Sequence, residues 1–258
     1  MTCKYPIILV HGIGIKQTKV IKAFGKIEQV LDAEGHRVYV ADVDAFGTIE
    51  TNAEQLKKYV LKVLEETGAE KVNVIGHSKG GLDTKYMINE LDMEDKVASL
   101  TTLCTPHRGS IVASWIWKLP GFIKRFMAFC INFVYKRIGD ENPNALRACD
   151  QLRWVDESEE TLRFSEKVYC QSYSTNLKRG RDCFILGIPM KLYRHFEKLD
   201  NDGLVCHDST KFGFYRGHCL DISVSHAQIV DLFTPKKKKE KVYDFYRSLC
   251  AELADMGF

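Results

Sequence analysis

One serine lies in a sequence pattern suited to covalent catalysis. Ser78 is the centre of the pentapeptide GHSKG, between an apolar run rich in β-branched residues and a run with helical periodicity. A serine at such a strand-turn-helix junction is held in a strained backbone conformation with its hydroxyl exposed, as in a nucleophile elbow. Glycine at positions 76 and 80 would let the strand and the helix approach closely. A simple turn with a surface serine is the alternative, and the periodicity on both sides favours the elbow.

A serine that attacks a carbonyl group also needs N–H donors for the negative charge that develops on the carbonyl oxygen. The residue after the nucleophile, Lys79, is one expected donor, and a loop after an early strand supplies the other. His11-Gly12-Ile13-Gly14 follows the first apolar run and fits this place in the chain. Glycine beside Ile13 lets a substrate reach the backbone, so Ile13 is the predicted second donor. The alternative is a tight turn without a catalytic role.

Alternating strands and helices are expected to hold these loops in place. The first apolar run, YPIILV, is typical of a strand that is buried on both faces of a parallel sheet. Further strands are predicted at Arg37 to Val43, before Ser78 and at Val97 to Cys104, and helices at residues 17–34, 51–67 and directly after Ser78. This order indicates an α/β fold with a mostly parallel sheet and helices on both faces.

The alternation stops after Gly109, where a bulky apolar segment begins. Lysine, arginine, proline and glycine interrupt it, and its longest uncharged part, FMAFCINFVY, is far shorter than the roughly 20 residues of a membrane span. We predict a helical cap or lid insertion at about residues 111–165, largely helical between 111 and 140. An interfacial helix on a lipid surface and an ordinary core helix are the alternatives. The candidate substrate contacts in this cap are its large aromatic residues, Trp115, Trp117, Phe122, Phe126 and Phe129.

Composition limits the class of protein. A chain of 258 residues with 45% hydrophobic side chains can form one domain, which we place at residues 1–258. The net charge of +3 gives no reason to expect nucleic acid as a partner. Nine cysteines without a paired spacing favour reduced thiols, and the N-terminus does not resemble a signal peptide, so a cytoplasmic location is expected. The lysine run 236–239 is predicted to be a solvated helix start.

Two Cys-His pairs contain residue types that bind metals. Cys206-His207 and His218-Cys219 consist of adjacent residues, which lack the usual separation between chelating ligands. Roles in packing and in loops are favoured for both pairs, and no metal is predicted.

Five segments in this order resemble one known family. YPIILVHGIG, VIGHSKGGLD, LTTLCTPHRGS, NDGLV and ISVSHAQIVDL are similar to segments of the bacterial triacylglycerol lipases and esterases, including clostridial-type members, of the α/β-hydrolase fold. The resemblance covers most of the chain, and residues 111–165 match only in character. It implies hydrolysis of acyl esters, lipid-like ones above all, through an acyl-enzyme on Ser78. The family's calcium-binding aspartate is not recognisable, because Gln228 and Asp231 fit its spacing poorly, and no cofactor is predicted.

Serine chemistry requires a histidine that accepts the hydroxyl proton and a carboxylate that fixes the histidine. The resemblance assigns Asp202, in the turn NDG, as the acid, and Asp200 and Asp208 are the nearby alternatives. It assigns His226 as the base, with His218 as the competitor.

Two other histidines have competing structural interpretations. His77, inside the elbow, is expected to support packing, and His107 is expected to be a structural element of its loop.

The triad leaves three function hypotheses. The first is a lipase or esterase that binds acyl esters and touches lipid surfaces through its cap. A cytoplasmic thioesterase or acyltransferase would use the same triad. A catalytically silent lipid-binding module is disfavoured because every triad position is filled.

Overall fold

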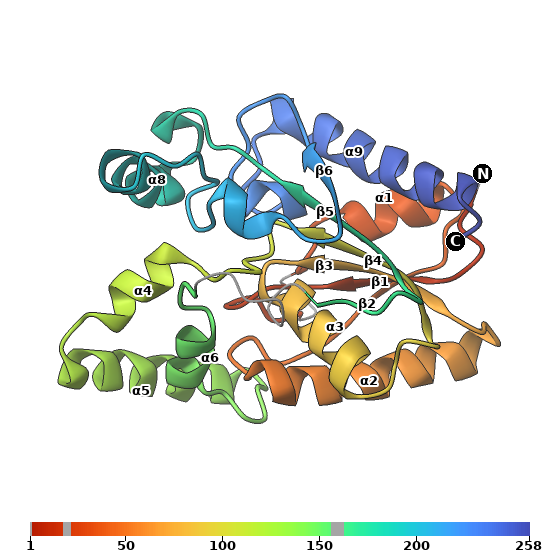
Figure 1. Cartoon of the computed structure of the whole chain (residues 1–258), viewed down its shortest axis with the longest axis horizontal. Helices are drawn as coiled ribbons and strands as arrows, with labels where there is room; N and C mark the ends of the chain where they lie inside the picture. The colour runs from red at the N-terminus through yellow and green to blue at the C-terminus, as the bar shows by residue number, and fades with distance from the viewer. Residues whose placement is uncertain (1, 18–21, 156–162) are drawn as a thin grey trace.

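A six-stranded sheet forms the centre of the computed structural model, which describes residues 2–17, 22–155 and 163–258 (Figure 1). The strand order is β2-β1-β3-β4-β5-β6, and every neighbouring pair is parallel, as the sequence predicted. The strands are β1 (Ile7–Val10), β2 (Val38–Val40), β3 (Val72–His77), β4 (Val97–Leu103), β5 (Tyr169–Ser174) and β6 (Phe214–His218).

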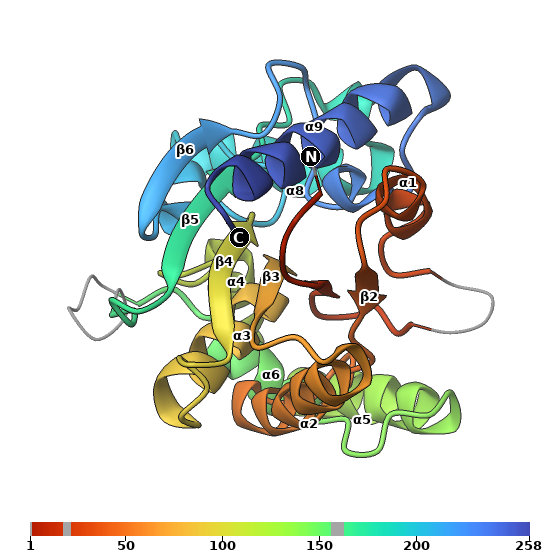
Figure 2. The same cartoon turned by 90° about the vertical axis from the view of Figure 1, so that its right-hand side faces the viewer.

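Two helical layers cover the sheet (Figures 1 and 2). Helices α1 (Ile27–Ala33) and α9 (Lys236–Asp255) cover one face, and α2 (Ile49–Thr67) and α3 (Lys79–Glu90) cover the other. Successive side chains of a strand point to opposite faces. In β1, Ile7 and Leu9 therefore pack in the cluster with α1 and α9, whereas Ile8 and Val10 pack in the cluster with α2 and α3. Burial on both faces explains why this strand is wholly apolar.

The first helix begins later in the chain than the sequence predicted. The prediction was residues 17–34, but α1 begins at Ile27, and residues 18–21 lie outside the described part of the chain. Gly25 has a positive φ of 51°, and a Cβ there would lie 2.5 Å from an Asp231 carboxylate oxygen. A turn at residues 23–26, packed this closely against Asp231, stands where the helix was predicted to continue.

Two further boundaries have local physical causes. Helix α2 begins at Ile49 because the Thr48 side chain accepts a hydrogen bond from the Thr51 N–H, and it ends at Gly68, as predicted, in the left-handed conformation. The strand predicted from Arg37 to Val43 extends only from Val38 to Val40 in the structure. Its hydrogen bonding to β1 ends with the bond from the Ala41 N–H to the Leu9 carbonyl at 2.9 Å.

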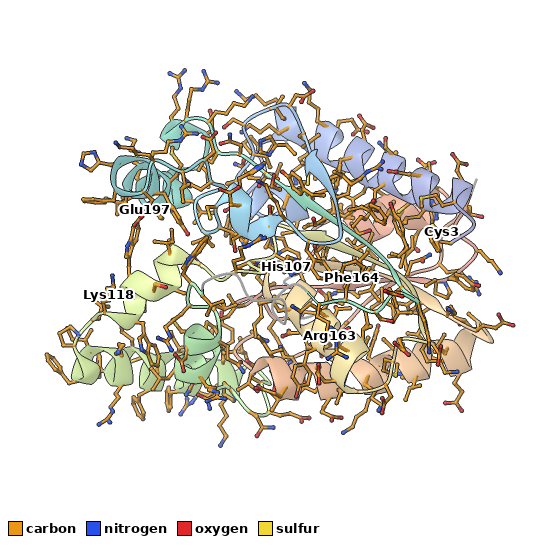
Figure 3. The ribbon with its side chains drawn as sticks, viewed as in Figure 1. Cys3, His107, Lys118, Arg163, Phe164 and Glu197 are labelled. Atoms are coloured by element: carbon orange, nitrogen blue, oxygen red, sulfur yellow. The ribbon has the colours of Figure 1, made fainter. Side chains whose placement is uncertain are left out.

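The remaining helices gather beyond the carboxyl ends of the strands (Figure 1). Lys118 and Glu197 each follow one of these helices, and Figure 3 shows both at this end of the molecule. His107 lies in the interior (Figure 3). The chain termini lie at the opposite end (Figure 1). The predicted helical character of residues 111–140 is confirmed, whereas residues 156–162 of the predicted cap lie outside the described residues. The helices are α4 (Ile111–Trp117), α5 (Gly121–Arg137), α6 (Ala145–Gln151) and α8 (Phe184–Phe196), with short 3-10 turns η1 (Gly180–Asp182), η2 (His207–Thr210) and η3 (Gln228–Val230).

The lysine run 236–239 opens α9, as predicted, but it is not wholly solvated. Lys238 is buried and donates to the Ser223 carbonyl at 2.5 Å, and Lys239 forms an ion pair with Asp231 at 3.0 Å. The prediction was wrong for Lys238 because a lysine at the first turn of a helix can reach the carbonyl groups of the loop that packs beneath it.

Candidate active site

The turn between β3 and α3 holds Ser78 in a strained conformation. Its φ is 54° and its ψ is −128°, which is rare for a residue other than glycine. A Cβ at Gly76 would lie 2.7 Å from the Gly81 Cα, and one at Gly80 would lie 2.5 Å from the His11 carbonyl oxygen. The predicted need for glycine at both positions is therefore met by close backbone approach.

Asp202 and His226 form a buried hydrogen-bonded pair. The His226 Nδ1 lies 2.7 Å from the Asp202 Oδ2, and the two residues are 5% and 1% exposed. The other carboxylate oxygen accepts from the backbone N–H groups of Leu204 at 2.9 Å and Val205 at 2.8 Å. Because a carboxylate only accepts, Nδ1 of the neutral ring carries the proton and Nε2 keeps its lone pair.

The backbone around this pair is fixed by three further hydrogen bonds. The His226 N–H donates to the Asp202 carbonyl at 3.0 Å, and the Gly203 N–H donates to the Asn201 side chain at 2.9 Å. From the elbow, the His77 Nε2 lies 2.9 Å from the His226 carbonyl. Burial lowers the pKa of His77 well below its ordinary value, so the ring is neutral and donates from Nε2. His77 thus supports the loop, in line with its expected structural role.

The loop at residues 11–14 lies directly against the serine. A Cβ at Gly12 would approach the Ser78 Cβ to 2.7 Å. The Gly14 N–H donates to the Ala45 carbonyl at 2.9 Å, and the Gly14 carbonyl accepts from the Tyr135 hydroxyl at 2.8 Å. The N–H of Ile13 has no partner within the described residues, so it is available to a ligand.

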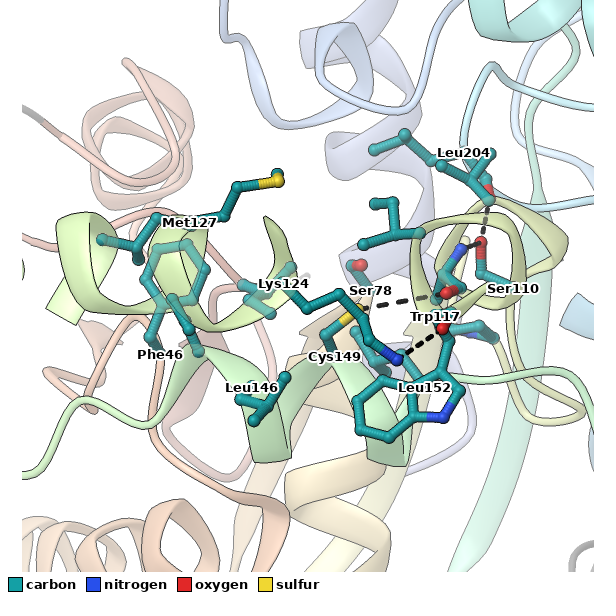
Figure 4. Close-up of a pocket in the computed structure, with 18 of the residues that line it drawn as sticks. Phe46, Ser78, Ser110, Trp117, Lys124, Met127, Leu146, Cys149, Leu152 and Leu204 are labelled. Carbon is teal, nitrogen blue, oxygen red and sulfur yellow. Dashed lines mark hydrogen bonds between the residues drawn. The ribbon is translucent and has the colours of Figure 1, made fainter. Parts of the chain in front are cut away.

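A cavity of about 220 Å³ opens at Ser78 (Figure 4). Side chains of α4, α5, α6 and the loop after Asp202 form its walls, and almost all of them are apolar. The charged Lys124 Nζ donates to the Trp117 carbonyl at 2.6 Å (Figure 4). The lining residues are Ile13, Phe46, Ser78, Pro106, Ser110, Val112, Ala113, Ile116, Trp117, Lys124, Met127, Ala128, Ile131, Ala145, Leu146, Cys149, Leu152, Leu204, Val205 and His226.

Only one of the five predicted cap contacts, Trp117, lines this cavity. Trp115 packs instead against Tyr193, with ring centroids 5.5 Å apart. Phe122, Phe126 and Phe129 are 76%, 68% and 67% exposed and do not line this cavity, so their role as substrate contacts of the cap stays a prediction.

Helix geometry gives the reason. Lys124, Met127, Ala128 and Ile131 recur at a spacing of three or four residues and face the cavity, which leaves the three phenylalanines on another face of α5. The same spacing, read from the sequence, would have placed Met127 and Ile131 on one face of the helix and the three phenylalanines on another.

The competing acids and histidines lie outside this site. Asp208 pairs with Lys211 at 2.6 Å, and Asp200 pairs with Arg194 at 3.2 Å. The His218 Nδ1 lies 2.7 Å from the Ser174 hydroxyl, on β6. His107 is buried, stacks on Phe212 and lies within hydrogen-bond distance of Thr102, which fits its expected structural role.

A cysteine adjoins the Asp202-His226 pair. Ligand atoms of Cys104, Asp202 and His226 lie within 4.8 Å of one another, the one such group of three potential metal ligands in the described residues. Burial raises the pKa of the Cys104 thiol well above its ordinary value, and its sulfur lies 3.2 Å from the Thr175 hydroxyl. A metal requires a thiolate, so this environment favours a neutral thiol in the core.

A strained serine above a parallel sheet, beside a histidine-carboxylate pair, defines the α/β-hydrolase class. Residues 5–202 match the family described as alpha/beta hydrolase fold, and the chain belongs to this family.

Its relatives include triacylglycerol lipases. A triacylglycerol lipase of Pseudarthrobacter phenanthrenivorans is 42% identical over 118 residues, 44% of this chain and 36% of the relative. Triacylglycerol lipase 2 of Saccharomyces cerevisiae is 28% identical over 262 residues, 90% of this chain and 73% of the relative. The chain thus spans about a third of the length of the bacterial relative.

A solved structure has the same fold. The Staphylococcus hyicus lipase superposes with a TM-score of 0.70 at 16% identity, over 98% of this chain and 96% of the lipase. Among the described residues, no helix combines the length and apolar character that a membrane crossing needs.

Proposed function

We propose that the protein is a serine carboxylic ester hydrolase of the lipase and esterase type, with Ser78, His226 and Asp202 as its catalytic triad. One observation carries this proposal: Ser78 and His226 line the same cavity while Asp202 fixes the His226 ring from behind at 2.7 Å. In this arrangement the free Nε2 is the base for the Ser78 hydroxyl.

The reaction has two steps. The Ser78 oxygen attacks the ester carbonyl and its proton passes to His226, which then protonates the departing alcohol. Water, deprotonated by His226, attacks the acyl-enzyme; as the bond to the Ser78 oxygen breaks, His226 returns the proton to that oxygen and the acid is released. Asp202 stays ionised and stabilises the imidazolium that forms in each step. The backbone N–H groups of Ile13 and Lys79 stabilise the oxyanion, and the position of Gly12 against Ser78 supports this role for the loop.

The substrate class follows from the cavity walls. An apolar acyl chain fits a cavity lined by aliphatic and aromatic side chains of α4, α5 and α6. The names of the relatives, which are triacylglycerol lipases, support a lipid-like acyl ester.

These helices form the cap of a single catalytic domain, and their outer faces contact lipid surfaces. On α5, the exposed aromatic residues Phe126 and Phe129 lie close in sequence to exposed Arg125, which supports this contact. Six of the nine cysteines are buried as small core residues, which supports a reducing, cytoplasmic compartment.

Substitution of the nucleophile tests the proposal. Ser78→Ala removes one hydroxyl, so it should reduce hydrolysis of p-nitrophenyl butyrate on the order of a thousandfold or more without changing the thermal unfolding midpoint. An alkyl phosphonate should add one covalent group to the wild-type protein, located at Ser78 by peptide mass spectrometry. Labelling at another residue, or an unlabelled and inactive wild type, would overturn the assignment.

A further inference from the structure

The side chain of Lys79 is buried beneath the elbow, although lysine is rarely buried. Its Nζ lies 2.6 Å from the Asp83 Oδ1, one turn later on α3, and both side chains are 1% exposed. The same Nζ donates to the Thr48 carbonyl at 3.3 Å. Lys79 therefore has two partners, one on its own helix and one in the loop before α2.

Asn52 extends this contact to the next loop. Its Nδ2 donates to the Asp83 Oδ2 at 3.1 Å and to the Asp44 carbonyl at 2.8 Å. There is no space for a side chain at Gly47, because a Cβ there would lie 2.0 Å from the Asn52 Oδ1. Asn52 is therefore held between the 44–48 loop and Asp83.

The 44–48 loop also holds the other proposed oxyanion donor. The Ala45 carbonyl accepts from the Gly14 N–H at 2.9 Å, one residue after Ile13. The two donors, the N–H groups of Ile13 and Lys79, thus belong to segments that are linked through this loop. Asp83 and Asn52 connect the elbow to the Asp44 carbonyl by hydrogen bonds, and Ala45, the next residue in the chain, connects to Gly14.

We infer that the buried Lys79-Asp83 pair and Asn52 position the oxyanion hole, by fixing the elbow relative to the 44–48 loop and thereby the separation of its two N–H donors. This inference rests on the proposed function, since it assigns a positioning role at the same site. Burying two charges is costly, and a pair of apolar residues of similar volume would be as stable or more stable. An apolar pair could not form the hydrogen bonds to Thr48 and Asn52, so it would not fix the positions of the Ile13 and Lys79 N–H groups.

The double variant Lys79→Met, Asp83→Leu separates positioning from stability. It fills the same space and leaves no buried charge, so the protein should fold with an unchanged or higher unfolding midpoint. Its kcat on p-nitrophenyl butyrate should fall about tenfold to a hundredfold with KM within about twofold, less than the loss on removing a whole oxyanion donor. The matched control is Lys62→Met, Glu66→Leu, which removes an exposed pair of the same spacing on α2 and should leave kcat unchanged.

Inhibition by a boronic acid is a second measurement. If the Lys79-Asp83 pair served only stability, the inhibition constant would not change in the folded double variant. The tetrahedral adduct of the boronic acid with Ser78 places a negative oxygen in the oxyanion hole, so the inhibition constant should rise by the same factor as kcat/KM falls. Wild-type kcat and boronate affinity in the folded double variant would overturn the inference.

Asp83→Asn decides the question if the double variant does not fold. This variant keeps the side-chain shape and removes the charge, so parallel losses in kcat and boronate affinity support the inference, and wild-type values overturn it. Phosphonate labelling of wild-type Ser78 keeps the two hypotheses apart. An unlabelled, inactive wild type contradicts the proposed function itself, whereas a labelled wild type with a fully active double variant contradicts only the positioning role.

Discussion

His226 is held from three directions, and this has consequences for single substitutions. The Asp202 carboxylate fixes its ring, the Asp202 carbonyl fixes its N–H, and His77 fixes its carbonyl. Under the proposed mechanism, the hydrogen bond to Nδ1 sets the tautomer. Asp202→Asn should therefore act mainly through the ring orientation and tautomer, since the amide has nearly the same shape as the carboxylate.

We expect His226→Ala and Asp202→Asn each to lower kcat on p-nitrophenyl butyrate by at least about a thousandfold. His218→Ala and Asp208→Asn are the matched controls, because their partners are Ser174 and Lys211 and neither lines the cavity. Steady-state kinetics of the four purified variants would check this. An inactive His218→Ala beside an active His226→Ala would contradict the assignment of the base.

Ser78 could be chosen from a short, local pattern, whereas the resemblance to bacterial lipases was needed to choose Asp202 over Asp200 and Asp208, and His226 over His218. Ser78 between glycines and Asp202 in an Asn-Asp-Gly turn have conformations that their immediate neighbours determine. The Lys79-Asp83-Asn52 network could not be predicted in this way, because it depends on how closely α2 and α3 pack. Cys104 beside Asp202 is likewise a contact between distant segments of the chain.

At the scale of elements, α5 has two apolar faces with different surroundings. Met127 and Ile131 face the cavity, whereas Phe126 and Phe129 are exposed. A helix that is hydrophobic around its circumference is normally buried, so the exposed face requires an explanation. The sequence indicated the helix and its composition, but it could not show which face would meet the cavity, because that depends on the position of α6 and the 44–48 loop.

The double variant Phe126→Ser, Phe129→Ser should therefore separate two kinds of substrate. Hydrolysis of soluble p-nitrophenyl butyrate should change less than about twofold, because neither side chain lines the cavity. Hydrolysis of emulsified long-chain esters should fall about tenfold, because the apolar area for a lipid surface is lost. Parallel assays on both substrates would measure this. Equal loss on both, or a lower unfolding midpoint, would instead indicate that this face is needed for folding.

Substitution on the inner face of α5 provides the complementary test. Met127→Ala enlarges the cavity and leaves Phe126 and Phe129 in place, so it should alter the preference for acyl chain length among soluble esters. The ratio of kcat/KM for p-nitrophenyl octanoate to that for the butyrate should rise a few-fold, since each added methylene gains up to about 0.8 kcal/mol when buried. An unchanged ratio would place the acyl chain elsewhere.

For the whole molecule, buried histidines determine how stability depends on acid. Burial lowers the pKa of His11 to about 4, and it lowers those of His77 and His107 well below the ordinary value. At these three histidines, the unfolded chain therefore binds more protons than the folded one below about pH 6.5. The free energy of unfolding is fully retained above that pH and falls as the pH drops toward 4, by up to about 1.4 kcal/mol per pH unit for each such histidine.

Urea denaturation between pH 7 and pH 4.5 would check this slope. His107→Gln should make the dependence less steep, because one buried imidazole no longer gains a proton on unfolding. His195→Gln, at an exposed position on α8, is the control and should leave the slope unchanged. A stability that rises on acidification would contradict the account.

The two ends of the chain meet far from the cavity. The Lys4 N–H donates to the carbonyl of Phe258 at 2.7 Å, so a few glycine and serine residues would be enough to link Thr2 covalently to Phe258. A circularly permuted enzyme, opened instead at the exposed turn around Gly139, should keep every contact of the sheet while it cuts the chain between α5 and α6. Its hydrolysis of soluble and emulsified esters would then report how far the cap depends on a continuous backbone at that turn.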